Sequence, residues 1–192
     1  GGYVFGVNYG GGSFTMLKRN PDDSLGAAVT TLSTGANAHE IVFDPSNRYA
    51  FVPNLGSNNV SQLIFDPKAG SIKFNGIQNV GLPQGAGPRH MAFHPKAPYA
   101  YVIRELDDKV TSFSFDANAG TLTPMQTIST LPMGQGGANN TCAEITFGAS
   151  GRFLYGSNRG DDSIVIFDVD PNSGMMTLVG HQPTGGSTPR HF

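Results

Sequence analysis

The sequence predicts an all-β fold, a β-propeller made of four-stranded antiparallel blades. A 28-residue template occurs three times without a gap, and its copies begin 50 and 54 residues apart. Each copy contains short apolar runs separated by turn residues, and no segment keeps a period of 3.6 residues beyond two helical turns. A fixed period of this size marks identical units that stack to bury their apolar faces. We therefore expect residues 1–192 to form a partial β-propeller domain.

The template begins at a phenylalanine anchor. Aromatic residues stand six and eight positions after the anchor, an aspartate stands 23 positions after it and a glycine 27. The anchors are Phe43, Phe93 and Phe147; the aromatics are Tyr49, Phe51, Tyr99, Tyr101, Phe153 and Tyr155; the aspartates are Asp66, Asp116 and Asp170; the glycines are Gly70, Gly120 and Gly174. This regularity predicts the same turns and strands in every copy.

The second copy shows the four expected strands most clearly. They are residues 90–93, 99–103, 110–115 and 121–128. The third of these alternates apolar and polar residues with period two, as a half-buried strand does. Runs this short, rich in aromatic and β-branched residues, favour strands over helices. Four antiparallel strands in each copy are typical of a propeller blade; a β-sandwich, the alternative, would not require strands that recur in register.

The two ends of the chain match parts of the template. Residues 3–25 match its second half, and residues 188–192 repeat the pattern of residues 87–91. We expect blades at 36–83, 86–130 and 141–182, with partial blades at 1–30 and 187–192. Because an open arc leaves unpaired strand edges, which natural proteins avoid, we expect the remaining blades of a longer ring as partners of this segment.

The composition argues against several partners. The net charge is −2, no run of Lys and Arg is present, and charged residues make up only 14% of the chain. Nucleic acid is therefore not an expected partner. No apolar stretch approaches the roughly 18 residues that would span a bilayer, so we expect no membrane insertion. The single cysteine, Cys142, fits a reducing compartment, which favours a cytoplasmic location.

Several segments closely resemble the β-propeller lactonase family, which includes 6-phosphogluconolactonase and the fungal carboxymuconate lactonizing enzymes. The resemblance lies in residues 8–13, 85–95, 99–106, 128–132 and 153–192, and covers essentially the whole chain. It implies a seven-bladed propeller, of which this chain would be the middle portion. Two residues depart from the family pattern: Arg104 stands where Asn is more frequent, and Cys142 where a small residue such as Ala is usual.

Ionisable residues recur at the blade edge that surrounds the central channel. Arg89 and His90 begin a first strand, and Glu105, 16 residues after Arg89, returns to the same edge. His39 lies at the matching place one blade earlier. Arg159 follows Phe147 by 12 residues, as Glu105 follows Phe93. The same position reads Leu55 in the blade before, so this position differs in kind from blade to blade.

These residues form the predicted site. We expect catalytic roles for His39, Arg89, Glu105 and Arg159, and the resemblance points to the same four. His90 and Arg190 are expected to bind substrate. Two ordinary explanations compete with this one: a histidine at a strand start often only bonds the backbone, and an exposed Arg–Glu pair contributes only about 0–1 kcal/mol.

Other chemical motifs are absent from the sequence or have a structural explanation. No Cys/His spacing fits zinc, and no Asp-rich loop fits an EF-hand. The run Gly10–Gly12 reads as a tight turn, because no helix follows it. We expect structural roles for His94, His181, Cys142 and the turn at residues 161–162. The sequence therefore predicts neither a metal nor a cofactor.

The predicted chemistry acts on a small anionic lactone. Glu105 or His39 would take a proton from water, and Arg89 or Arg159 would stabilise the oxyanion. The remaining arginines, with Arg190, would bind the anionic end of the substrate. The resemblance favours hydrolysis of 6-phosphogluconolactone to 6-phosphogluconate. A lactonizing isomerase of the carboxymuconate type and a non-catalytic binding propeller remain the alternatives.

Overall fold

A computed structural model describes residues 2–135 and 137–192, and in these residues the chain forms strands and no helix. The strands make four antiparallel sheets. The first sheet contains β1 (Tyr3–Asn8), β2 (Ser13–Arg19) and β3 (Leu25–Ser33). The second contains β4 (Val42–Phe43), β5 (Tyr49–Asn54), β6 (Asn59–Asp66) and β7 (Ser71–Gly81). The third contains β8 (Pro88–Phe93), β9 (Tyr99–Arg104), β10 (Lys109–Asp116) and β11 (Thr121–Ser129). The fourth contains β12 (Thr141–Phe147), β13 (Phe153–Arg159), β14 (Ser163–Val169) and β15 (Met176–Pro183).

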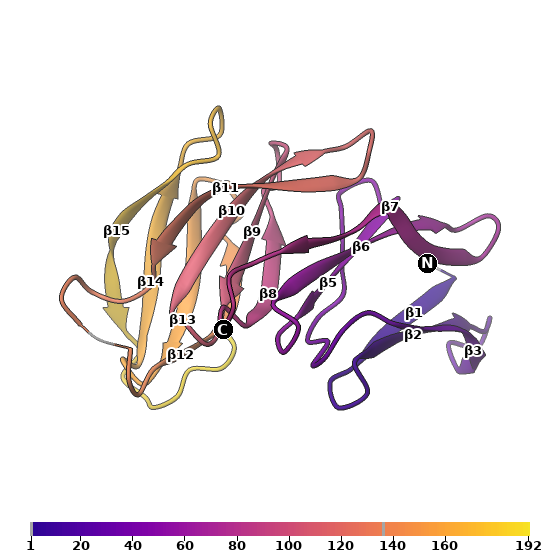
Figure 1. Ribbon diagram of the computed structural model, residues 1–192, viewed down its shortest axis with the longest axis horizontal. Helices are drawn as coiled ribbons and strands as arrows, with labels where there is room; N and C mark the ends of the chain where they lie inside the picture. Colours follow the sequence, from indigo (N-terminus) through magenta and orange to yellow (C-terminus); the bar gives the residue numbers. More distant parts are fainter. Residues whose placement is uncertain (1, 136) are drawn as a thin grey trace.

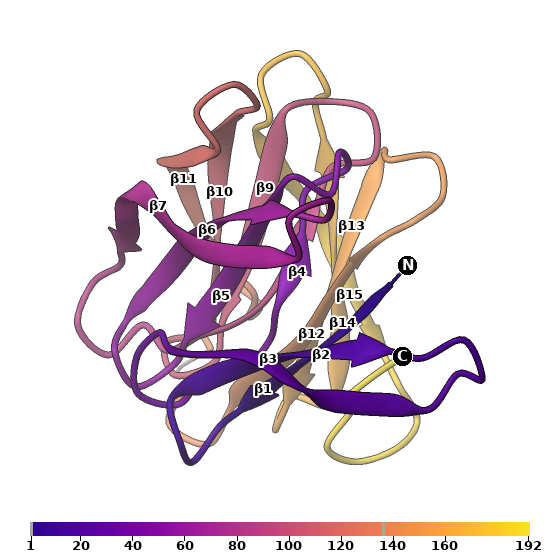
Figure 2. The ribbon, with the colours of Figure 1, turned by 90° about the vertical axis from the view of Figure 1, so that its right-hand side faces the viewer.

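The sheets follow one another across the molecule in chain order (Figure 1). In the turned view, β1, β2 and β3 run across the picture while β13, β14 and β15 stand upright (Figure 2). The sheets are therefore rotated relative to one another, as the blades of a propeller are. This confirms the predicted all-β fold of antiparallel blades.

The hydrophobic core is divided into clusters that lie between neighbouring sheets. The first joins Phe14 and Met16 of β2 to side chains of the second sheet such as Leu63. The second joins Phe51 to Met91 and Phe113 of the third sheet. The third cluster continues the series between the third and fourth sheets, with Tyr101, Ile103, Leu154 and Phe167. Each blade thus buries its faces against the next one, which is why the units must stack.

The glycine and tyrosine of the template meet across blades. Gly120 has φ 67°, and a Cβ added there would overlap the ring of Tyr49 from the preceding blade. The hydroxyl of Tyr49 donates to the carbonyl of Asn118 at 2.6 Å. The pair repeats one blade later, where Gly174 lies under Tyr99. The fixed spacing in the sequence therefore records a contact that docks each blade on its neighbour.

The template aspartate closes the turn that leads to this glycine. Asp116 Oδ1 accepts hydrogen bonds from the backbone amides of Asn118 and Ala119, at 2.8 and 3.0 Å. Asp66 makes the equivalent bonds to Lys68 and Ala69. An acidic side chain that bonds the amides two and three residues further on stabilises this kind of turn.

The ends of the chain differ in part from the sequence prediction. The first sheet has three strands that match the later strands of the template, and β3 extends to Ser33, beyond the expected limit of residue 30. Residues 187–192, predicted to begin another blade, form no strand. Among the described residues, no strand is paired with this segment, yet His191 still reaches the side chain of Glu144 on β12.

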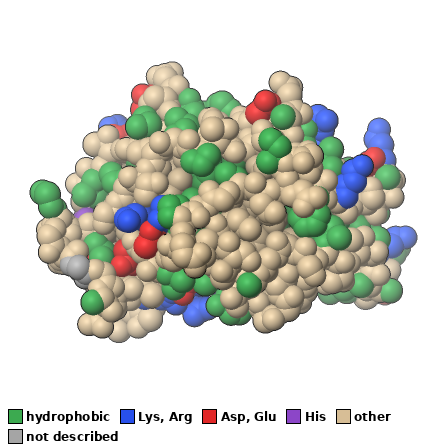
Figure 3. Space-filling model, in the orientation of Figure 1, with side chains coloured by type: hydrophobic (Ala, Val, Ile, Leu, Met, Phe, Trp, Pro, Cys, Tyr) green, Lys and Arg blue, Asp and Glu red, His purple; other side chains and the backbone are tan. Residues whose placement is uncertain are grey.

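The surface agrees with the low charge of the sequence. On the face shown in Figure 3, Lys, Arg, Asp and Glu side chains lie in small separate groups, and no broad basic area covers it. Among the described residues, no helix is long and apolar enough to cross a membrane.

Candidate functional site

The predicted residues lie where first strands begin and second strands end. Arg89 and His90 belong to β8, and Glu105 directly follows β9, held by a hydrogen bond from its amide to the carbonyl of Gly87 at 2.7 Å. Arg159 is the last residue of β13. His39 precedes the short strand β4, but its amide donates to Pro53 at 2.9 Å, so antiparallel pairing continues beyond that strand. The topology therefore delivers these side chains to one edge.

Glu105 is held between two arginines from neighbouring blades. Its Oε2 lies 2.9 Å from Arg89 Nε, and its Oε1 lies 2.6 Å from Arg159 Nη2. The side chain of Arg89 is 3% exposed, that of Arg159 12% and that of Glu105 18%. This is a largely buried triad with a net positive charge, unlike the exposed pair that was the ordinary alternative for Glu105.

The arginines are also fixed to the backbone of β12. Arg89 Nη1 donates to the carbonyl of Ala143 at 2.7 Å, and Arg159 Nη2 donates to that of Cys142 at 3.0 Å. Because each guanidinium is held on two sides, its position is set before any ligand arrives. Such preorganised cations suit a carboxylate, a phosphate or a developing oxyanion.

Three buried polar atoms at this edge have no hydrogen-bond partner. Among the described residues, the buried side-chain atoms in this state are His39 Nδ1, Arg89 Nε and Arg159 Nε. Arg89 Nε is close enough to Glu105 for an ion pair, but its N–H is not directed at the carboxylate as a hydrogen bond requires. Buried polar atoms are nearly always hydrogen-bonded, so unsatisfied ones gathered in a single site indicate a place for a polar ligand.

His39 is neutral at physiological pH. Burial lowers its pKa to about 4, and the positive charges of Arg89 and His90 act in the same direction, against the opposing effect of Glu105. Its ring packs edge-on against the rings of Tyr9 and His90, with centroids 5.7 and 5.0 Å apart. His39 thus places an uncharged imidazole beside the triad of Arg89, Glu105 and Arg159.

A second row of ionisable residues crosses the blades at the third position before each anchor. In the three complete copies this position holds Glu40, His90 and Glu144. His191 occupies the matching place in the terminal Pro-Arg-His pattern. Glu144 lies between two imidazoles: its Oε1 is 3.2 Å from His90 Nδ1 and its Oε2 is 2.5 Å from His191 Nδ1. Glu40 Oε2 instead accepts a hydrogen bond from the amide of Met91 at 2.7 Å.

Sequence reasoning missed both glutamates of this row. A signal was present, because acid and imidazole alternate at one template position in successive blades. The row shows that the position directly after that of Arg89 also carries ionisable side chains in each complete copy.

Arg190, predicted to bind substrate, is exposed. Its charge nevertheless acts on the site: burial lowers the pKa of Arg89, and the positive charges of Arg159 and Arg190 add to this, against the opposing effect of Glu105. The structure thus brings together His39, Arg89, His90, Glu105 and Arg159, and leaves Arg190 at the margin.

The residues expected to be structural make structural contacts. His181 Nε2 lies 2.8 Å from the carbonyl of Thr130, and His94 Nδ1 accepts from the amide of Lys96 at 3.0 Å. Cys142 is fully buried, and burial raises the pKa of its thiol. Arg104, which departs from the family pattern, is buried and forms an ion pair with Asp107.

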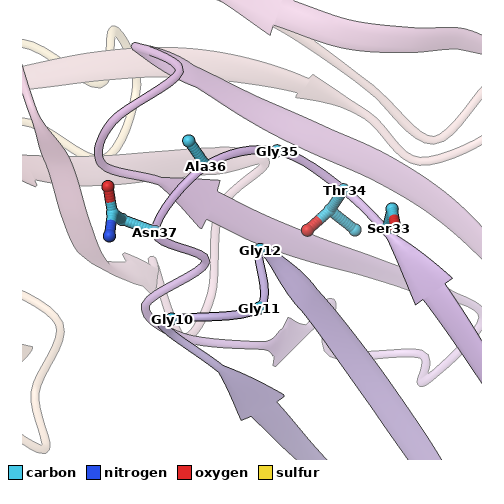
Figure 4. Close-up of a pocket in the computed structure, with 8 residues that line it drawn as sticks. All are labelled: Gly10, Gly11, Gly12, Ser33, Thr34, Gly35, Ala36 and Asn37. Carbon is cyan, nitrogen blue, oxygen red and sulfur yellow. The ribbon is translucent and has the colours of Figure 1, made fainter.

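A shallow hollow of about 620 Å³ lies between the turn that joins β1 to β2 and the segment that follows β3 (Figure 4). Gly10–Gly12 and residues 33–37 line it. Its lining contains no ionisable side chain, so it supplies no acid, base or cation of its own. Within the described residues, no group of three or more His, Cys, Asp and Glu side chains is placed to hold a metal ion.

Sheets rotated relative to one another, with Arg89, Glu105 and Arg159 gathered at one edge of them, define a β-propeller with a positively charged site. The family model described as "Lactonase, 7-bladed beta-propeller" matches residues 1–192, and the chain belongs to this family.

Several of its relatives are named 6-phosphogluconolactonases. The chain is 34% identical to a 6-phosphogluconolactonase of Pectobacterium carotovorum over all of its length and 57% of the relative's. It is 32% identical to a 6-phosphogluconolactonase of Bacillus subtilis, covering 99% of this chain and 40% of that protein. The chain thus spans 57% and 40% of the lengths of these two relatives.

Solved structures agree with the fold. A periplasmic gluconolactonase from Pseudomonas aeruginosa superposes with a TM-score of 0.91 at 32% identity, over 98% of this chain and 56% of that one. A putative 6-phosphogluconolactonase from Bacteroides uniformis gives a TM-score of 0.91 at 32% identity, over 100% of this chain and 57% of that one.

Proposed function

We propose that the protein is a lactonase that hydrolyses a small anionic lactone, with 6-phosphogluconolactone as substrate and 6-phosphogluconate as product. The observation that carries the proposal is the group of unsatisfied nitrogens on His39, Arg89 and Arg159. Two fixed guanidinium groups and one neutral imidazole offer donors to an anionic substrate and to the oxyanion that forms from it. The names of the relatives supply the substrate class.

The reaction needs a nucleophilic water and a stabilised oxyanion. A base takes one proton from water while the water oxygen bonds to the carbonyl carbon of the lactone. The negative charge that develops on the carbonyl oxygen is stabilised by an arginine N–H, and one such donor is commonly worth about 3–4 kcal/mol. The tetrahedral intermediate then collapses, the bond between the carbonyl carbon and the ring oxygen breaks, and the ring oxygen takes up the proton.

Binding of the substrate depends on the second arginine. Guanidinium groups bind carboxylates and phosphates through two parallel N–H donors, which fixes orientation as well as charge. The net positive charge of the Arg89–Glu105–Arg159 triad and the nearby charge of Arg190 favour a ligand with a phosphate or carboxylate. Other groups along the channel would come from the blades of the longer ring, which we propose as the native context of this segment.

The test is an assay on the protein as expressed, including any sequence that flanks these residues. Hydrolysis of 6-phosphogluconolactone forms a carboxylic acid, so proton release above the spontaneous rate measures turnover. We expect Arg159→Gln to lower kcat/KM by about a hundredfold, the effect of losing one oxyanion donor. Arg152→Gln is the matched control, because Arg152 is exposed and its ion pair is with Asp168, outside the site. A wild-type protein that converts a carboxylated muconolactone but no sugar lactone would be an isomerase; one that converts neither would refute the enzymatic proposal.

The cytoplasmic location is proposed on the single cysteine alone. A structural neighbour of this chain is named as a periplasmic protein, so the location does not follow from the fold. Fractionation of cells that express the intact protein tests this point.

A further inference from the structure

Glu144 fixes the tautomer of His90, that is, which ring nitrogen carries the hydrogen. The carboxylate lies 3.2 Å from His90 Nδ1, and it also accepts from its own following amide, that of Ile145, at 3.0 Å. A carboxylate oxygen accepts, so Nδ1 of His90 carries the hydrogen. Within the described residues, His90 Nε2 has no hydrogen-bond partner. The nitrogen with the free lone pair is therefore Nε2, and the side chain is 19% exposed, within reach of water.

The other groups that can act as the base are less well arranged for that role. Both oxygens of Glu105 are engaged by guanidinium groups, at 2.9 and 2.6 Å. Its geometry suits a residue that positions two cations. His39 has a buried Nδ1 without any hydrogen-bond partner, so no carboxylate is bonded to its ring to orient it.

We propose that His90 is the general base of the site and that Glu144 is the residue that positions it. This inference rests on the proposed lactone hydrolysis. His90 Nε2 takes one proton from the attacking water as the oxygen bonds to the carbonyl carbon. The same proton passes to the ring oxygen of the lactone when the carbon–oxygen bond breaks, so His90 ends the cycle neutral. It is then a catalytic residue, whereas the sequence predicted that it binds substrate.

The surroundings of Glu144 support this role. Burial raises its pKa, but the hydrogen bonds from His90 and His191 outweigh that effect, and the pKa is lowered to about 2. The carboxylate is therefore charged at neutral pH, and it stabilises the imidazolium that forms during the reaction. The remaining charged groups that face His90 and Glu144 are Glu40, His39, Arg89 and His191.

The first experiment measures the tautomer directly. Nitrogen-15 NMR of the imidazoles in the intact wild-type protein should show neutral His90 protonated at Nδ1, with an unprotonated Nε2. A His90 that carries its hydrogen on Nε2 would overturn the proposal. This measurement needs no active enzyme and no variant.

The second experiment is kinetic. Glu144→Gln should lower kcat at least tenfold with little change in KM, and should move the acidic limb of the kcat/KM profile to lower pH, because a protonated His90 loses its counter-charge. Glu144→Asp should restore part of the activity. His90→Gln should cost about 10²–10⁴-fold, as loss of a general base does, whereas His181→Gln, on an outer strand, should keep wild-type turnover. If Glu144→Gln fails to fold, Glu144→Asp and the NMR measurement decide.

Different results would refute the lactonase proposal and the assignment of His90 and Glu144. An inactive wild-type protein refutes the lactonase proposal. An active wild-type protein with unchanged kcat and pH profile in folded Glu144→Gln refutes only the assignment of His90 and Glu144.

Discussion

Replacing Glu105 with glutamine should both destabilise the protein and impair the site. The substitution keeps the size of the side chain and removes its charge, so two arginines lose their shared counter-ion. Arg89 is the more affected of the two, because its side chain is 3% exposed and cannot move its charge into water.

The size of the effect follows from the two contacts. At separations of 2.9 and 2.6 Å and an effective dielectric constant of about 20, each contact is worth roughly 6 kcal/mol of Coulomb attraction, most of which offsets desolvation. Removing one partner of a buried ion pair costs about 3–5 kcal/mol. The side chain of Glu105 is 18% exposed and the carbonyl of the substituted glutamine would still accept one hydrogen bond, so we expect a loss of about 2–4 kcal/mol.

Denaturant titration of the intact protein measures this loss as a change in the free energy of unfolding. The matched control is Asp168→Asn, which removes a carboxylate from an ion pair of 2.9 Å whose side chains are 66% and 36% exposed. That pair should contribute only about 0–1 kcal/mol. We also expect Glu105→Gln to lower turnover at least tenfold, since the arginines would no longer be held in place. Equal losses of stability in the two variants, with unchanged turnover, would refute the reasoning about the triad.

Two further predictions concern acid stability and the docking of blades. The pKa of His39 is about 4 in the fold against 6.5 without perturbation, so the unfolded chain binds a proton first as the pH falls. The free energy of unfolding should therefore decrease between about pH 6.5 and 4, by roughly 1–3 kcal/mol given the partial exposure of His39. In denaturant titrations at each pH, His39→Gln should make this decrease smaller. The same pH dependence in His39→Gln and in the wild type would show that His39 does not cause the decrease. Gly120→Ala should lower the free energy of unfolding by at least about 2 kcal/mol, because φ is 67° and the new methyl group would overlap Tyr49. Gly76 has open space around it, so the free energy of unfolding of Gly76→Ala should stay within about 0.5 kcal/mol of the wild-type value. Similar stabilities for these two glycine variants would show that the contact with Tyr49 can relax at little cost.

The strands and their order could be predicted because the repeat records them. The anchor Phe93 and the alternation in residues 110–115 place strands β8 and β10 without any knowledge of the fold. The approach of Arg89 to Glu105 also follows from antiparallel pairing, since both stand at the same end of neighbouring strands. These inferences use only distances along the chain.

The partners of each charge could not be predicted in the same way. Glu105 contacts Arg159 from the next blade, and this contact depends on the angle between two sheets, which the sequence does not specify. The same limit applies to Glu144, whose carboxylate joins His90 of the preceding blade to His191. The side chain of Arg190 is exposed, and its role in binding the anionic end of a substrate stays a prediction.

The repeat itself separates residues that build the ring from residues that make the site. Positions that keep their kind in every copy, such as the turn aspartate and Gly120, make contacts inside a blade or dock it on its neighbour. The positions of Arg89 and Glu105 change in kind, reading His39 and Leu55 one blade earlier.

The blade that carries Leu55 and His39 at these two positions has no carboxylate and no guanidinium there, so it cannot form the same ion pair. The triad takes Arg89 and Glu105 from the blade of the third sheet and Arg159 from the blade of the fourth. It therefore depends on two blades with different residues at these positions following one another along the chain. This is why the ion pairs of the site join residues that are distant in sequence, whereas the repeat explains only their common edge.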